Sequence, residues 1–270
     1  MPSVPTLSIL IPLYIEAENL EELFDRLTQV LIGLGMTYEI ICVNDGSQDA
    51  TLETVLGYFA EEKHLRVIDF SRNFGKEAAM TAGLDCARGE AVILMDADLQ
   101  DPPEVIPDLV AQWQQGYEVV YATRRSRRGE TWFKRTTASL FYRVISYISD
   151  VPIPKNTGDF RLLDRRVVEA IKQLPERNRF MKGIFSWVGF KQISVRFDRH
   201  PRYHGMSSWS FWRLWNFALD GITSFSVIPL KFWTYFGSVF AILSLFYAAV
   251  LVLRTLIWGV DVPGYASLMV

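Results

Sequence analysis

The stretch Ala91–Pro103, AVILMDADLQDPP, decides the fold of this 270-residue chain. A short apolar run predicts a buried strand, and Asp96 and Asp98 follow it directly. Side chains two positions apart in an extended segment point to the same face, so both carboxylates are expected to aim at one point. That point lies past the carboxyl end of the strand, where open α/β sheets bind ligands. Paired carboxylates there suit Mg²⁺ or Mn²⁺ held together with phosphate groups; the alternative is an acidic turn before a helix that begins at a proline.

Strand and helix patterns alternate on both sides of this stretch. Apolar runs predict strands at residues 7–13, 38–43, 65–70, 91–95, 118–122 and 160–163. Helical periodicity predicts helices at residues 21–34, 50–62, 76–87, 104–115, 132–148 and 167–174. This alternation indicates an α/β fold, Rossmann-like, with a mostly parallel sheet that helices cover on both faces.

The last third of the chain has a different character. Residues 232–253 carry no charge, and at about 1.5 Å per residue a helix of this length crosses the hydrocarbon core of a bilayer. Trp233, Tyr235 and Trp258 lie near its ends, as interfacial anchors do. Residues 207–218 are rich in Trp and Phe and predict an amphipathic helix that lies in the membrane interface.

These patterns divide the chain into four parts. We expect an α/β domain at residues 1–200 and juxtamembrane amphipathic helices at 201–228. A transmembrane helix at 229–258 follows, and then a loop with the start of a second transmembrane helix at 259–270. The N-terminus has no basic region before its first apolar run, which indicates a strand and not a signal peptide.

The overall charge and the cysteines narrow the class of protein. The net charge of −2 provides no field that would attract nucleic acid. Cys42 and Cys86 lack the spacing of a metal site and predict reduced thiols in a cytoplasmic domain.

Polar and aromatic residues follow the ends of the predicted strands and form the candidate site. The glycines of a phosphate-binding P-loop or of a dinucleotide-binding G-x-G-x-x-G turn are absent after every predicted strand. The residues found there instead are Pro12, Tyr14 and Glu16, then Asn44 and Asp45, then Asn73, Phe74, Gly75 and Lys76, and finally Asp96 and Asp98. Tyr14 suits stacking on a base, Asp45 suits a base N–H or a ribose hydroxyl, and Lys76 at a helix start suits phosphate. Each is also an ordinary turn or cap residue, and their shared placement favours one crevice.

Five motifs in this order resemble the family-2 glycosyltransferases of GT-A fold. They are Pro12-Leu13-Tyr14, Asn44-Asp45-Gly46-Ser47, Arg72-Asn73-Phe74-Gly75-Lys76-Glu77, Asp96-Ala97-Asp98-Leu99-Gln100-Asp101-Pro102 and Gly158-Asp159-Phe160-Arg161-Leu162. Within that family the chain is most similar to the polyprenyl-phosphate glycosyltransferases, above all the bacterial bactoprenol (undecaprenyl-phosphate) glucosyltransferases, to which the dolichol-phosphate mannose synthases are related. The motifs Pro175-Glu176-Arg177-Asn178, Met181-Lys182-Gly183 and Ser186-Trp187-Val188-Gly189 add to the likeness.

The resemblance implies a metal-dependent transfer of one sugar at the inner membrane, with the catalytic domain on the cytoplasmic side. Asp96 and Asp98 would hold Mg²⁺ or Mn²⁺ against the donor diphosphate, and Asp98 and Asp159 would be the catalytic residues. Asp159 would lie beside the acceptor, as a base or as a positioning group. The nucleotide-sugar contacts would come from Pro12, Tyr14, Glu16, Asp45, Phe74, Lys76 and Asp96. A single displacement would invert the anomeric carbon.

A basic segment follows the fifth predicted strand. Six arginines and lysines occur within residues 124–135. The resemblance favours Arg124, Arg127, Arg128 and, further on, Arg202 as ligands of the acceptor phosphate, because guanidinium groups bind phosphate bidentately. The alternative is a solvated charge run. Family members carry Arg-x-x-Gly-x-[Ser/Thr]-Lys where this chain has Arg202-Tyr203-His204-Gly205-Met206-Ser207-Ser208, so the lysine is missing.

The resemblance leaves other readings open. UDP-glucose is the favoured donor, with GDP-mannose and a UDP-aminoarabinose as alternatives. A processive polysaccharide synthase would carry Gln-x-x-Arg-Trp, which this chain lacks. A catalytically silent membrane scaffold would not need Asp96, Asp98 and Asp159. A homo-oligomer is compatible with the aromatic membrane anchor.

Overall fold

The computed structural model of the protein describes residues 5–61, 64–124, 157–174, 179, 181–198 and 228–259. The helices predicted at 132–148 and 207–218 and the second span predicted after residue 259 lie outside the described residues. The division of the chain into four parts therefore stays a prediction.

The described residues form a seven-stranded sheet with the order β3-β2-β1-β4-β6-β5-β7. The strands are β1 (Leu7–Leu13), β2 (Tyr38–Asn44), β3 (Leu65–Asp69), β4 (Ala91–Leu94), β5 (Val119–Arg124), β6 (Thr157–Asp164) and β7 (Gln192–Phe197). The first four strands in this order, β3, β2, β1 and β4, are parallel to one another, which confirms the predicted α/β sheet. The apolar side chains of β1, β2 and β4 are buried on both faces, as expected of central parallel strands.

One strand is antiparallel within this mostly parallel sheet. β6 runs antiparallel to both of its neighbours, β4 and β5. Leu94, the last residue of β4, pairs with Arg161 of β6. The first residues of β6, including Asp159, therefore lie at the carboxyl ends of β1 and β4. This direction brings Asp159 to the same edge of the sheet as Asp96 and Asp98.

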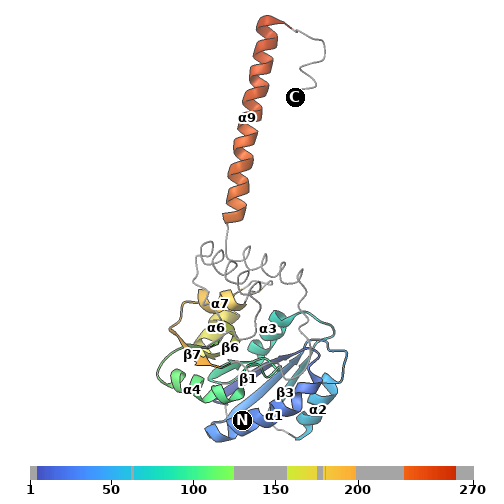
Figure 1. Ribbon diagram of the computed structural model, residues 1–270, viewed down its shortest axis with the longest axis vertical. Coiled ribbons are helices and arrows are strands. Elements are labelled where there is room, and N and C mark those ends of the chain that lie inside the picture. The colour runs from blue at the N-terminus through green and yellow to red at the C-terminus, as the bar shows by residue number, and fades with distance from the viewer. Residues whose placement is uncertain are drawn as a thin grey trace.

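Helices cover both faces of the sheet (Figure 1). One face carries α1 (Leu20–Leu34), α2 (Thr51–Glu61) and α4 (Ile106–Gln114), and the other carries α3 (Lys76–Cys86), α6 (Arg165–Lys172) and α7 (Met181–Trp187). Short 3₁₀ turns at Ala17–Asn19 and Pro103–Val105 precede α1 and α4. The domain is thus a three-layer sandwich with one hydrophobic core on each side of the sheet.

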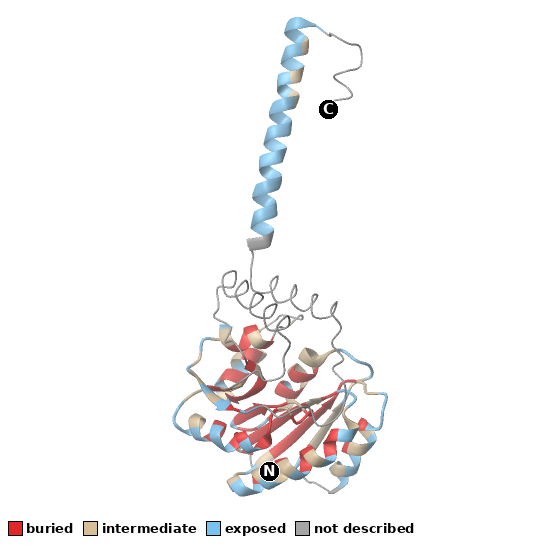
Figure 2. Ribbon diagram, viewed as in Figure 1, coloured by how far each residue is buried: buried red, intermediate tan, exposed pale blue. Residues whose placement is uncertain are grey.

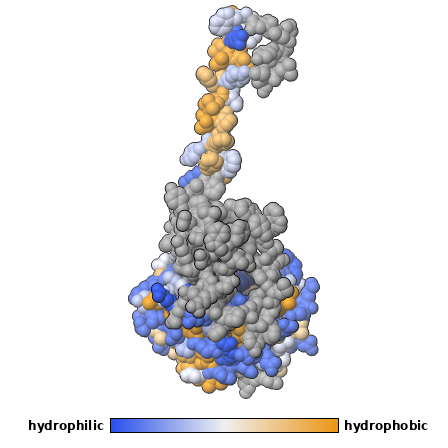
Figure 3. Space-filling view, viewed as in Figure 1, coloured by the Kyte–Doolittle hydropathy of each residue, from blue (hydrophilic) through white to orange (hydrophobic). Residues whose placement is uncertain are grey.

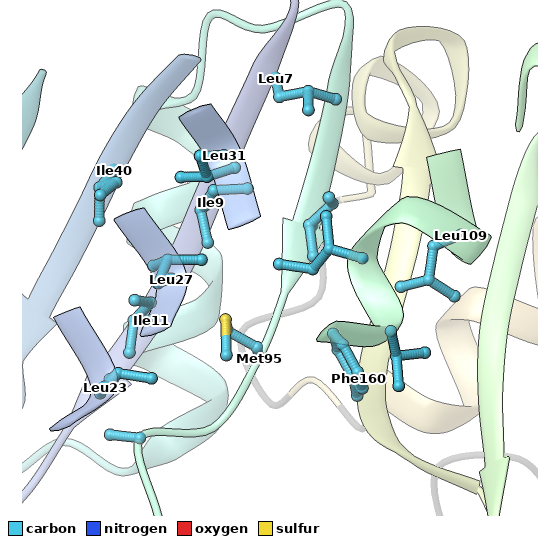
Figure 4. Packing of buried hydrophobic residues seen from close by; sticks show 14 of the residues in the cluster. Leu7, Ile9, Ile11, Leu23, Leu27, Leu31, Ile40, Met95, Leu109 and Phe160 are labelled. Carbon is cyan, nitrogen blue, oxygen red and sulfur yellow. The ribbon is translucent and has the colours of Figure 1, made fainter. Parts of the chain in front are cut away.

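Successive side chains of β1 point alternately into the two hydrophobic cores. Ile9 and Ile11 face Leu23 and Leu27 of α1 in the first core (Figure 4). Leu10 points to the other face, where it joins the core that contains α3. All of these side chains are buried, and burial is concentrated in the central strands (Figure 2). Each buried aliphatic side chain stabilises the fold by about 1.5–3 kcal/mol, and this packing fixes the strand ends that carry the site.

Two short elements were not predicted, and one strand is longer than predicted. β7 is an edge strand of alternating half-buried and exposed residues, and α7 has seven residues, so neither shows a long apolar pattern. β6 extends over Thr157–Asp164, beyond the predicted 160–163. The other predicted strands and helices within the described ranges agree with the structure to within about two residues.

The C-terminal helix α9 (Ile228–Trp258) has the length and composition of a membrane span. Its segment Leu230–Trp258 has a mean hydropathy of 2.4, and its most apolar window is not buried inside the structure. The side chains form an apolar column that projects from the α/β domain (Figure 3). The predicted apolar helix is confirmed, and it extends beyond the uncharged run to include Lys231 and Arg254.

Candidate active site

The two predicted metal-binding aspartates follow β4 by way of a turn. The Met95 N–H donates to the carbonyl of Leu10 at 3.1 Å, which continues the sheet to that residue. Asp98 Oδ1 then accepts from the Gln100 N–H at 3.1 Å, and Leu99 has a φ of +56°. Residues 97 and 98 lie in a turn beyond the end of β4, so the extended geometry assumed for residues 96–98 is wrong. Left-handed backbone at a bulky residue is rare and concentrates at functional sites.

A third carboxylate joins Asp96 and Asp98. Asp101 is 2% exposed, and its Oδ1 has no hydrogen-bond partner among the described residues. Burial, together with the negative charges of Asp96 and Asp98, raises the pKa of Asp101 to about 7 against the opposing charge of Arg124. The turn therefore concentrates negative charge. The sequence placed Asp101 near the pair but did not show that it is buried.

Lys76 at the start of α3 joins two carboxylates. Its Nζ lies 2.6 Å from Asp96 Oδ1 and 2.5 Å from Asp159 Oδ2. Burial alone would lower the pKa of Lys76, but the charges of Asp159 and Asp96 outweigh it and raise the pKa above its ordinary value. A permanently charged ammonium thus links the end of β4 to the start of β6.

Asp159 lies between two lysines. Its Oδ1 is 4.0 Å from Lys182 Nζ of α7 and accepts no hydrogen bond from the residues that the structure describes. Burial opposes ionisation, but Lys76 and Lys182 hold the pKa of Asp159 well below its usual range. Asp159 is therefore an anion at neutral pH, and its lowered pKa makes it a weak base, which favours the positioning role over the base role.

A buried arginine holds the start of β6. Arg161 donates to the carbonyl oxygens of Gly158 at 2.8 Å and Asp159 at 3.3 Å, and its guanidinium lies 4.0 Å from the ring centroid of Phe185 in α7. Burial lowers the pKa of Arg161 to about 10, against the charge of Asp159. The signal in the sequence was a lone charge inside an apolar strand, because a buried charge needs partners.

Glu77 connects α3 to α7. Its Oε2 accepts from the Met181 N–H at 3.2 Å, at the start of the helix that carries Lys182. Burial and, to a smaller extent, the charge of Asp159 raise the pKa of Glu77 to about 7. The cost of ionising Glu77 in the folded state is therefore a pH-dependent part of the stability.

We expect Glu77→Gln to remove this pH-dependent part of the stability. Glu77 has a higher pKa in the folded than in the unfolded state, so its contribution to stability falls as the pH rises from about 4 to about 7 and is then level. Glutamine never ionises and its carbonyl still accepts from Met181, so the variant should gain stability relative to wild type across this interval. Unfolding midpoints at pH 4, 5.5 and 7 measure the difference. A constant difference across the three pH values would contradict the expectation.

The predicted nucleotide contacts lie on loops that are tied to one another. The Asp45 N–H donates to the carbonyl of Leu13, and the Ile15 N–H donates to Ser47 Oγ. The carboxylate of Asp45 accepts from the N–H groups of Phe74 at 2.7 Å and Gly75 at 2.9 Å. The loops after β1, β2 and β3 are thus brought together. Asp45 holds the turn before Lys76, a role that the sequence did not predict.

The remaining nucleotide candidates differ in their surroundings. Tyr14 is 40% exposed, and Phe74 is 50% exposed with the Arg72 guanidinium 4.0 Å from its ring centroid. Both rings are accessible for stacking. Pro12 is half-buried at the end of β1, and the Glu16 carboxylate accepts from Asn19 Nδ2 at 2.6 Å. Their contacts with a nucleotide stay predictions.

Of the four predicted phosphate-binding arginines, the structure describes Arg124. Its Nε is buried and has no hydrogen-bond partner in the described part of the chain, and its charge opposes the rise in the pKa of Asp101. An ideal Cβ on Gly158 would lie 3.4 Å from Arg124 Nη2 and 3.8 Å from Asp101 Oδ2, both ordinary van der Waals distances, so Arg124 lies beside the first residues of β6 and beside Asp101. Arg127, Arg128 and Arg202 lie outside the described residues.

Comparison with known proteins identifies the family. The model of glycosyl transferase family 2 matches residues 8–172, which include the whole α/β core up to α6. The chain belongs to this family. An uncharacterized glycosyltransferase of Synechocystis is 61% identical to it over 98% of this chain and 83% of the relative. The bactoprenol glucosyl transferase of Shigella phage SfV is 46% identical over 98% of this chain and 86% of that protein.

Solved structures agree with this glycosyltransferase in fold. Glucosyl-3-phosphoglycerate synthase from Mycobacterium tuberculosis, in complex with Mn²⁺, UDP-glucose and phosphoglyceric acid, has a TM-score of 0.53 and 17% identity. It covers 81% of this chain, and 77% of its own chain is matched. The α/β domain therefore has the GT-A fold, as the motifs implied.

Proposed function

We propose that this family-2 glycosyltransferase transfers one sugar from a nucleotide donor, UDP-glucose in the first instance, to a polyprenyl phosphate in the membrane. The observation that carries the proposal is the Lys76 bridge between Asp96 and Asp159. It joins the predicted donor side and the predicted acceptor side of the reaction within one ion-pair network. The bactoprenol glucosyl transferases that match nearly the whole chain support the lipid acceptor.

The carboxylates after β4 fit a divalent metal. In the described part of the chain, no three His, Cys, Asp or Glu side chains are already grouped in metal-binding geometry. The buried Asp101 oxygen without a partner and the mutual repulsion of Asp96, Asp98 and Asp101 are nevertheless features that a cation relieves. Asp96 and Asp98 would hold the ion. When bound, Mg²⁺ or Mn²⁺ neutralises charge that develops on a diphosphate leaving group.

The residues themselves suggest the remaining chemistry. Lys76 supplies a fixed positive charge next to Asp96, where the leaving diphosphate gains negative charge. The acceptor is a phosphate monoester that is already anionic at pH 7, so it needs little help from a base. We therefore propose that Asp159, kept ionised by two lysines, positions the acceptor side and does not remove a proton. One direct displacement inverts the anomeric carbon.

Membrane attachment by α9 completes the proposal. A polyprenyl phosphate keeps its chain in the bilayer and its phosphate at the surface, so an enzyme that uses it gains from an anchor beside the catalytic domain. The 29-residue apolar segment of α9 provides the length for such an anchor. We place the catalytic domain on the cytoplasmic side, where nucleotide sugars are made.

The test is transfer of labelled glucose from UDP-glucose to undecaprenyl phosphate in detergent with Mg²⁺ or Mn²⁺. We expect label in the lipid that is lost with EDTA and falls about a hundredfold in Asp96→Asn, whose amide oxygen is a weaker metal ligand. Asp108→Asn on the exposed face of α4 is the matched control and should keep wild-type activity. Absence of transfer from UDP-glucose together with transfer from GDP-mannose or a UDP-aminoarabinose would change the donor. No transfer from any donor would contradict the function.

A further inference from the structure

We propose that Lys182 binds the phosphate of the acceptor, an inference that rests on the function proposed above. Lys182 is the second residue of α7, and its Nζ lies 4.0 Å from Asp159 Oδ1. That separation permits attraction between the charges but exceeds a hydrogen bond. Within the described residues, Lys182 Nζ makes no hydrogen bond, so its three N–H donors remain available to a ligand.

Lys76 does not offer the same opportunity. It is already within 2.6 Å of Asp96 Oδ1 and 2.5 Å of Asp159 Oδ2, so two of its donors are engaged. A phosphate that approached Asp159 without another cation would meet a carboxylate of the same charge. Lys182 supplies a cation on the side of Asp159 away from the Lys76 bridge, since it faces the other carboxylate oxygen. In this proposal Lys76 serves the donor diphosphate and Lys182 serves the acceptor phosphate.

The surrounding contacts hold Lys182 in place. The first N–H of α7 is bound by Glu77, the residue next to Lys76. Phe185, one turn further along α7, is buried under the guanidinium of Arg161, which in turn holds the carbonyl of Asp159. Both sides of the Lys182–Asp159 pair are therefore anchored to the same buried arginine. Preorganisation of this kind is what a specific phosphate site needs.

The position of α7 agrees with a ligand that comes from a membrane. α7 lies at the end of the α/β domain nearer to α9 (Figure 1). Its last residue, Trp187, is 55% exposed, and tryptophan is enriched where proteins meet the membrane interface. One short helix thus presents an interfacial side chain at its end and a phosphate-binding amine at its start.

The experiment separates the Michaelis constants for acceptor and donor. Full-length wild type, Lys182→Ala and Lys182→Arg are assayed with undecaprenyl phosphate and UDP-glucose each varied in turn. We expect Lys182→Ala to raise the KM for undecaprenyl phosphate about tenfold, the effect of one charge-assisted hydrogen bond, and to leave the KM for UDP-glucose within about twofold. Lys182→Arg should recover most of the loss. Lys191 lies directly before β7, at the other end of the strands from the site, and Lys191→Ala should match wild type.

Three outcomes would overturn the inference. An unchanged acceptor KM in Lys182→Ala would show that the amine does not bind the acceptor, and a raised donor KM would place it on the nucleotide sugar. If the wild type transferred sugar to no polyprenyl phosphate, the proposed function would fail together with this inference. If the wild type were active and only the Lys182 result differed from expectation, the inference alone would fail. Should Lys182→Ala not fold, Lys182→Gln, which retains a polar side chain of similar length, is judged by the same two constants.

Discussion

Replacement of Lys76 by methionine is expected to lower the rate of sugar transfer about a thousandfold. Methionine keeps the length and the apolar stem of the side chain but removes the ammonium that joins Asp96 to Asp159. The two carboxylates then repel each other, and the leaving diphosphate loses a fixed positive charge. The effect should fall on kcat, because the charge matters most in the transition state.

The same substitution should change how stability depends on pH. The cation holds the pKa of Asp159 below its unfolded value, so Asp159 stabilises the fold above about pH 4 and loses this contribution as the pH falls further. Without Lys76 that acid-sensitive contribution is smaller. The stability difference between wild type and Lys76→Met should therefore be largest near pH 7 and should narrow from about pH 5 toward pH 2. Thermal unfolding at several pH values measures it.

A lysine outside the site provides the control. Lys172 in α6 pairs with Glu169 on the surface, and Lys172→Met should keep activity within about twofold, since an exposed pair contributes little. If Lys76→Met retained more than a tenth of the wild-type rate while Lys172→Met behaved normally, the bridge between Asp96 and Asp159 would not matter for catalysis.

The sequence predicted the parts of the site that local patterns determine. Parallel strands end at a common edge, so a polar residue directly after an apolar run is placed by its own segment. Asp45 and Asp96 follow β2 and β4 as predicted, and Lys76 begins α3. The turn at Leu99 was not predicted, because a left-handed leucine has no signature in composition or period.

Contacts between distant segments could not be predicted from the sequence. Lys76 and Asp159 are 83 residues apart, and their contact depends on the antiparallel direction of β6, which a strand pattern does not specify. Lys182 was seen only as part of a motif, because α7 is too short for a clear helical period. The structure adds the buried network of Glu77 and Arg161, which fixes these distant parts against each other.

Substitution of Gly46 by alanine is the second change with a large expected effect, and it acts on the fold beneath the site. Gly46 has a φ of +65°, a conformation that costs an alanine about 1 kcal/mol. An added Cβ would also lie 2.4 Å from the backbone carbonyl carbon of Arg72 and 2.6 Å from the backbone nitrogen of Asn73. Backbone atoms cannot move aside as a side chain does. We expect a loss of about 3 kcal/mol or more and a fall in the unfolding midpoint of about 10 °C.

Gly46→Ala should also weaken binding of the nucleotide sugar. The segment that would be pushed away leads directly to Phe74 and Gly75, whose N–H groups bind Asp45, and then to Lys76. The KM for the nucleotide sugar should therefore rise in any variant protein that folds. Gly57→Ala is the matched control, because Gly57 lies exposed in α2 with no atom within 4 Å of an added Cβ. Alanine there should stabilise by about 0.5–1 kcal/mol. A Gly46→Ala protein as stable as Gly57→Ala would show that the loops after β2 and β3 do not pack as closely as this structure has them.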